Sequence, residues 1–151
     1  MAAQSSQEQL SAWRSFLEVH SAVIKALEKE LIEDQGFSLT WYDVLTHLSE
    51  ASGARMQHQA LAESLLLSRS GVTRLVDRMA EAGLVCRESS PQDRRVSYVV
   101  MTQPGRDALD RASPGHMRGI AQHFVRYLEA GDVALLHPAL AAGGEQAVRT
   151  T

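Results

Sequence analysis

The chain has 151 residues, of which 44% are hydrophobic, and this suits a single domain with a real apolar core. No apolar run approaches the roughly 20 residues of a membrane span, and the first residues lack the pattern of a signal peptide, so we expect a cytoplasmic protein that has no membrane partner. The single cysteine, Cys86, excludes an internal disulfide and any zinc site built on paired cysteines.

The formal net charge is −3, but the charge is unevenly distributed. Residues 1–52 contain three basic and eight acidic side chains, whereas residues 68–95 contain six arginines and four acidic side chains. Arginine carries a fixed guanidinium fork that suits both phosphate and base edges. The distribution therefore indicates a local basic surface on an acidic chain.

A long amphipathic helix is expected over residues 7–34, because large apolar residues recur every three or four positions and Gly36 follows as a C-terminal cap. Its start carries more large apolar residues than one small core can bury. We interpret that end as a dimer contact; the alternative is that the helix packs along its own domain. A second helix is expected to open at Thr40, with Thr40 and Asp43 as a capping box, and to end near residues 52–53.

A helix-turn-helix is expected next, from a short helix over residues 57–64, a turn over residues 65–67 and a basic helix that starts at Ser68 as N-cap. In the basic helix Val72, Leu75, Val76 and Met79 share one apolar face. The opposite face carries guanidiniums and short hydroxyls, which suit a DNA major groove. The residues assigned to that groove are Ser68, Arg69, Ser70, Thr73 and Arg74. Taken alone, this face is also typical of an ordinary solvated helix.

Two short β-type runs, residues 85–88 and 96–100, flank a polar stretch over residues 89–95, and this pattern predicts a two-stranded wing with a basic tip. Thr102 is the expected N-cap of a further helix that continues to about Leu128, with a kink at residues 113–115. A last helix is expected from Gly131, with a bend at Pro138 and a frayed tail from Gly143.

The order of these elements resembles the MarR family of bacterial transcription regulators, and the resemblance spans nearly the whole chain. It is carried by residues 68–79, 82–85 and 89–95, the last ending in Asp93-Arg94-Arg95, and by Thr102-Gln103-Pro104-Gly105. It implies a mainly α fold with a small two- to three-stranded β wing. Residues 1–151 would form one domain, with a winged helix-turn-helix head over residues 38–101 and a helical dimerisation lobe over residues 7–34 and 102–142.

The resemblance also implies a homodimer that binds pseudo-palindromic double-stranded DNA, most simply as a repressor. A wing arginine, Arg95, would enter the minor groove while Asp93 holds its guanidinium. The side chains expected on phosphates are Gln57, Arg78 and Arg94. The dimer contacts expected are Leu10, Trp13, Phe16, Leu17, Val133, Leu136 and Leu140. A small aromatic or apolar effector would bind between lobe and head, near His20, Trp41, Tyr42 and Leu45.

Other functions find less support in the sequence. The six histidines show no metal-ligand spacing, so neither a metal nor a cofactor is expected. Cys86 is interpreted as a buried strand residue rather than a redox sensor. No nucleophile elbow, phosphate loop or metalloprotease motif indicates an enzyme. The alternative that remains is a winged-helix module that binds proteins; the arginine-lined helix and basic wing favour DNA.

Overall fold

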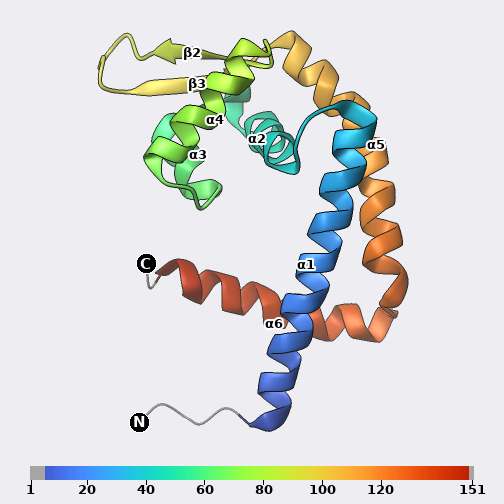
Figure 1. Ribbon diagram of the computed structural model, residues 1–151. Coiled ribbons are helices and arrows are strands. Elements are labelled where there is room, and N and C mark those ends of the chain that lie inside the picture. The colour runs from blue at the N-terminus through green and yellow to red at the C-terminus, as the bar shows by residue number, and fades with distance from the viewer. Residues whose placement is uncertain (1–5, 150–151) are drawn as a thin grey trace.

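The computed structural model describes the backbone of residues 6–149 and the side chains of residues 6–144 (Figure 1). Its elements follow in the order α1 (Gln7–Gln35), α2 (Leu39–Glu50), η1 (Ser52–Ala54), β1 (Arg55–Gln57), α3 (His58–Ser64), α4 (Arg69–Glu81), β2 (Val85–Ser89), β3 (Ser97–Met101), α5 (Gln103–His123), η2 (Val125–Tyr127) and α6 (Ala130–Arg149). Helices α2 to α4 and the sheet form a head, from which α1 and α5 descend side by side. Among the described residues, none of the helices combines the length and apolar character needed to cross a bilayer.

The ends of α1 and α2 show how local and distant groups cap a helix. The helix α1 ends at Gly36, which adopts the left-handed conformation at φ 76° as the sequence predicted. The predicted capping box at Thr40 is wrong. Ser38 is the N-cap of α2, and its Oγ accepts from the backbone N–H of Trp41. The Glu28 carboxylate of α1 accepts from the backbone N–H of Leu39. The free N–H groups of the first turn therefore find acceptors two residues earlier than the sequence pattern suggested.

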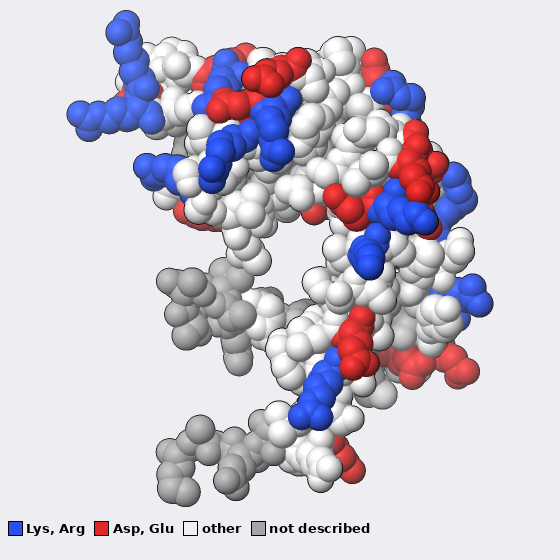
Figure 2. Space-filling view, viewed as in Figure 1, with Lys and Arg blue, Asp and Glu red and all other residues white. Residues whose placement is uncertain are grey.

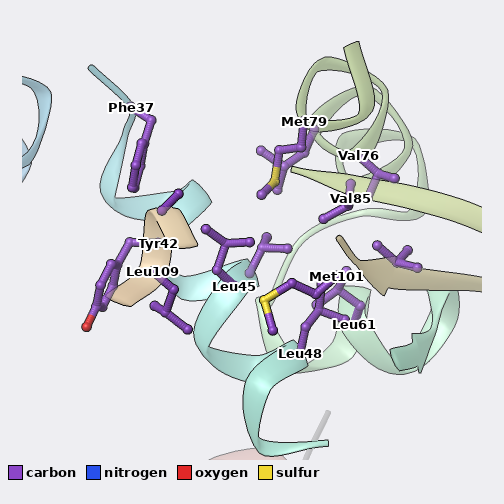
Figure 3. Close-up of a cluster of buried hydrophobic side chains, with 14 of the residues drawn as sticks. Phe37, Tyr42, Leu45, Leu48, Leu61, Val76, Met79, Val85, Met101 and Leu109 are labelled. Atoms are coloured by element: carbon purple, nitrogen blue, oxygen red, sulfur yellow. The ribbon is translucent and has the colours of Figure 1, made fainter. Parts of the chain in front are cut away.

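The core of the head lies where α2, α3, α4 and the sheet meet (Figure 3). Its largest fully buried side chains are Val44, Leu45, Leu48, Leu61, Val72, Val76, Met79 and Val99. Helices α2 and α4 supply six of these eight residues, and those from α4 lie on its predicted apolar face. Each buried leucine or valine contributes on the order of 1.5–3 kcal/mol, so this cluster fixes α4 firmly against the rest of the head.

The wing belongs to a three-stranded antiparallel sheet in the order β1-β3-β2. The strand β1, with only three residues, was too short for its alternation to be recognised in the sequence. Its Arg55 stacks 3.9 Å above the ring of Tyr98 in β3 and lies 3.7 Å from the carboxylate of Glu88 in β2. One side chain of β1 thus contacts both strands of the wing.

The start of α5 packs closely against the turn between α4 and β2. Thr102 is the N-cap, as predicted, and its Oγ1 also donates to the carbonyl of Gly83 at 2.6 Å. The backbone approaches so closely that a Cβ at Gly105 would lie 2.1 Å from the carbonyl oxygen of Leu84. Only glycine fits at this contact.

The C-terminal helices differ from the predictions in their bounds. The helix α5 ends at His123 rather than near Leu128, because Phe124 leaves the helical conformation. Pro114 and Pro138 both lie inside continuous helices, and α5 changes direction along its length in Figure 1. The frayed tail expected from Gly143 is wrong for the backbone, since α6 continues to Arg149.

Candidate nucleic-acid interface

The helix α4 presents the polar face that the sequence predicted. Ser68 is its N-cap, and the Ser68 Oγ accepts from the backbone N–H of Gly71 at 3.1 Å. A Cβ at Gly71 would lie only 3.1 Å from that oxygen, so glycine at this position leaves room for the cap. The apolar face, with Val72 and Val76 at 0% exposure, is turned into the core. The side chains on the other face are therefore held in a defined register towards solvent.

The five residues predicted to lie in the major groove line one open hollow of about 800 Å³ on α4: Ser68, Arg69, Ser70, Thr73 and Arg74. Arg74 and Arg78 also line a second hollow, on the side of α4 that faces the N-terminus of α2. Figure 2 shows Lys and Arg side chains gathered over α4 and the wing, with a few carboxylates between them. The structure thus brings the predicted basic residues of the helix onto one surface.

The tip of the wing is built by side chains that bond to the backbone. The buried Ser90 organises the loop between β2 and β3, because its Oγ accepts from the backbone N–H groups of Gln92 and Asp93. The carboxylate of Asp93 accepts from the backbone N–H of Arg95 at 2.9 Å. This differs from the expectation that Asp93 holds the guanidinium of Arg95. The aspartate shapes the turn, and the side chains of Arg94 and Arg95 extend into solvent.

A recess of about 290 Å³ separates α4 from the wing, and three guanidiniums line it. Its lining residues are Gln57, His58, Gln59, Arg69, Thr73, Arg87, Arg95, Val96 and Ser97. Arg87 is engaged within the protein, because its Nη2 donates to the Asp77 carboxylate at 2.7 Å and to the carbonyl of Thr73 at 3.1 Å. Within the part of the chain that the structure describes, no ion pair engages the guanidinium of Arg69 or Arg95, and both side chains are exposed and can meet an anionic ligand.

His58 is a residue of this recess that the sequence did not single out. Its Nε2 lies 3.3 Å from the Oγ1 of Thr73, a residue on the next helix. Burial lowers the pKa of His58, and the positive charges of Arg87 and Arg69 lower it further, against a smaller opposing effect of Asp77. No local pattern marks His58, because its partner and the arginines come from other elements.

The residues predicted to make dimer contacts lie exposed on α1 and α6. Leu10, Trp13, Phe16 and Leu17 are 43–55% exposed. On α6 Val133 and Leu140 are 47% exposed and Leu136 is half-buried. The rings of Trp13 and Phe16 stack with their centroids 5.9 Å apart. Large apolar side chains therefore form an extended patch on the described surface.

The predicted effector residues do not gather at one cavity. His20 lines an apolar cavity of about 460 Å³ between α1 and α6, together with Phe16, Leu136 and Leu140. Leu45 is fully buried in the core of the head, and Tyr42 is 8% exposed. Trp41 is half-buried and stacks on Phe37 at 6.5 Å. Of the four residues, only His20 lines this cavity.

Tyr42 instead joins the head to α5. Its hydroxyl lies 3.2 Å from the Oγ of Ser113, and its ring lies 4.3 Å from the ring of His116. Burial lowers the pKa of His116, although the carboxylates of Asp43 and Glu30 oppose this effect. Burial also favours the neutral form of Asp43 and therefore raises its pKa. Among the described residues, no group forms a hydrogen bond with the buried Nδ1 of His116, so the packing of this ring disfavours a charged imidazole.

Two further expectations concern sensing residues. Cys86 was expected to be buried, but it is exposed on β2, because strand residues alternate between the two faces of the sheet and Val85 takes the inner one. Across residues 6–144, no three histidine, cysteine or acidic side chains gather as a metal ion would require.

Helix, turn, basic helix and wing together define a winged helix-turn-helix protein, and comparison with known proteins identifies the family. A family model described as "MarR family" matches residues 35–96. The structure of AbsC, a MarR-family transcriptional regulator from Streptomyces coelicolor, is 31% identical, covers 99% of this chain and all of that chain, and superposes with a TM-score of 0.90. The chain therefore belongs to the MarR family of transcriptional regulators, and its relatives are regulators rather than enzymes.

Two other relatives are similar over most of the chain. Sco3205, a MarR-family regulator from the same organism whose structure was solved in complex with DNA, is 26% identical. The match covers 97% of this chain and 91% of that chain, with a TM-score of 0.90. An uncharacterised HTH-type regulator of Bacillus subtilis, YkoM, is 28% identical over 78% of this chain and 77% of its own length.

Proposed function

We propose that this regulator binds pseudo-palindromic operators as a homodimer and represses transcription by blocking access to the promoter. The observation that carries the proposal is the hollow on α4 where Ser68, Arg69, Ser70, Thr73 and Arg74 meet. A helix that presents two guanidiniums and three hydroxyls in one register can form hydrogen bonds with several base edges at once. The DNA complex of the similar Sco3205 supports the same use of this fold.

Within this proposal the basic side chains fall into two groups. Arg69 and Arg74 contact base edges, because they lie in the hollow with the hydroxyls. Arg78 contacts phosphate, together with Gln57 and Arg94. Arg95 enters the neighbouring minor groove, and the turn shaped by Asp93 presents it.

The homodimer is proposed from the apolar patch on α1 and α6. Side chains as large as Trp13 and Phe16 at about half exposure favour burial against a second surface. In each chain the lobe would comprise residues 7–34 and 102–142, and the head residues 38–101. Pairing of the two lobes would then place the two heads about one helical turn of DNA apart.

We further propose that a small apolar or aromatic molecule releases the operator by binding beside His20. The cavity there has about 460 Å³, which is within the range that small ligands occupy. It shares Phe16, Leu136 and Leu140 with the proposed dimer contacts, so the molecule would bind where the two chains meet. A thermal-shift screen with phenolic and other aromatic compounds tests this. Compounds that stabilise the protein should also lower its operator affinity, and His20→Ala should weaken both effects. Stabilising compounds that leave operator binding unchanged would contradict the proposal.

The experiment that tests the main proposal is genomic footprinting with the purified protein at physiological salt, starting upstream of its own gene. We expect a few protected sites with two-fold symmetric half-sites and reduced transcription from the neighbouring promoters. Binding that shows no preference above the non-specific background would contradict it and would favour a winged helix that binds proteins.

A further inference from the structure

The hydroxyl of Thr73 is held by partners on both sides. Its Oγ1 lies 2.9 Å from the carbonyl oxygen of Arg69, one turn earlier on α4, and 3.3 Å from the Nε2 of His58 on α3. The carbonyl of Thr73 is engaged as well, by the guanidinium of Arg87. Threonine in a helix divides between two χ1 rotamers, so contacts of this kind select one of them.

The hydrogen positions follow from the inventory of donors and acceptors. A carbonyl oxygen can only accept, so the single hydroxyl hydrogen of Thr73 is donated to Arg69. The remaining contact requires that His58 donates from Nε2–H to the Thr73 oxygen. Thr73 then offers one lone pair and its γ-methyl group to a ligand, and no hydrogen.

We propose that His58 is a positioning residue: it holds the Thr73 side chain in the rotamer whose hydroxyl donates to Arg69, so that Thr73 meets the operator as a hydrogen-bond acceptor and sets a base preference. The inference rests on the proposed function, in which Thr73 faces the major groove. Guanine presents only acceptors on its major-groove edge, whereas adenine and cytosine present an amino group and thymine presents a methyl group. Thr73 therefore disfavours guanine and accepts the other three bases at the position that it contacts.

The surroundings of His58 keep this arrangement in place. Arg69 and Asp77 face it from α4, Arg87 from β2 and Arg95 from the wing. The neighbouring guanidiniums disfavour an additional proton on the imidazole. Nε2–H donates in the neutral tautomer and in the imidazolium alike, so the base preference should not change between pH 6 and 8.

Sequencing of operators selected from a randomised half-site library tests the proposal with the full chain. The wild type should exclude guanine at one position in each half-site. Thr73→Val should identify that position, because valine keeps a methyl group and lacks the acceptor. His58→Ala should reduce the discrimination against guanine at the same position by about 2- to 10-fold, the value of one hydrogen bond, and leave the other positions unchanged.

Two control variants separate positioning from general damage. His58→Gln retains an N–H donor on a side chain of similar reach, so it should preserve the preference. Gln59→Ala should also preserve it, because the Gln59 amide lies in the same recess but donates to Glu63 on its own helix.

The outcomes distinguish this inference from the proposed function. A wild type that enriches no sequence contradicts the proposed function. A wild type that enriches an operator, while His58→Ala keeps the full discrimination at the position altered by Thr73→Val, overturns the role of His58 alone. A base preference at that position that disappears between pH 6 and 8 overturns the assignment of His58 as the donor.

Discussion

The winged head and the distal part of the helical lobe bury large apolar side chains to very different degrees. In the head Val44, Leu45 and Leu48 have no exposed surface. At the start of α1, Trp13 is 55% exposed and Leu10 is 48% exposed. The head therefore completes its core within one chain, whereas the distal lobe carries apolar surface that a second molecule can cover. The difference separates residues that determine the stability of the fold from residues available for association.

The largest effect is expected in the core of the head. Leu48→Ala truncates a fully buried side chain of α2 in the core of the head. We expect the free energy of unfolding to fall by about 2–5 kcal/mol, measured by urea denaturation. Leu135→Ala is the matched control, since the same truncation at a side chain of the lobe that is 77% exposed should cost much less. Equal losses for both variants would contradict the contrast between the two regions.

The distal lobe should respond in association rather than in folding. Phe16→Glu places a carboxylate in the apolar patch, and we expect the dimer dissociation constant to rise by about 100-fold in sedimentation equilibrium, the effect of a central interface aromatic. Circular dichroism should show a folded head. Lys25→Glu adds a carboxylate on the polar side of α1 and should leave the association unchanged. A wild-type chain that is monomeric at micromolar concentration would contradict the dimer proposal.

The arginines of the head should affect DNA binding without changing the dimer. Arg69→Ala should cost about 1–3 kcal/mol on the selected operator and relax one base position. Arg78→Ala should weaken all sequences alike and lower the slope of affinity against salt, because fewer counterions are released. Fluorescence anisotropy at several salt concentrations measures both effects. The two assignments fail if the base preferences respond to Arg78 rather than to Arg69.

A smaller effect is expected in the turn that precedes α4. Leu66 has a left-handed backbone at φ 53° and is 85% exposed, so it combines backbone strain with little burial. Leu66→Gly should raise the free energy of unfolding by about 0.5–1 kcal/mol, since the strain relieved exceeds the added freedom of the unfolded chain. Leu67→Gly has no positive φ to relieve and should instead destabilise the protein. Thermal denaturation compares the two variants, and a destabilised Leu66→Gly would contradict the strain argument.

The smallest effect concerns the contact between head and lobe. Burial lowers the pKa of His116 in the folded state, so the folded protein binds fewer protons than the unfolded one. Its contribution to stability is therefore present above the unfolded pKa of about 6.5 and decreases as the pH falls through that value. His116→Gln should flatten the dependence of urea midpoints on pH between 5 and 8. A His116→Gln variant that keeps the wild-type slope would contradict this assignment.

Periodicity and capping were sufficient to predict most of the helices from the sequence. The apolar face of α4, its N-cap Ser68, the N-cap Thr102 and the terminal Gly36 all depend on residues within a few positions of one another. Such local interactions act in the same way wherever the helix packs. The basic face of α4 followed directly, because a helix with one buried stripe must expose the remaining residues.

Only the tertiary structure decided contacts between residues that lie far apart in the chain. Ser38 rather than Thr40 is the N-cap of α2, since Glu28 of α1 completes the cap. The strand β1 exists because β3 pairs with it. The link between His58 and Thr73 forms only once α3 docks against α4. Docking sets these distances through the packing of whole elements, and no local pattern in the sequence carries that information.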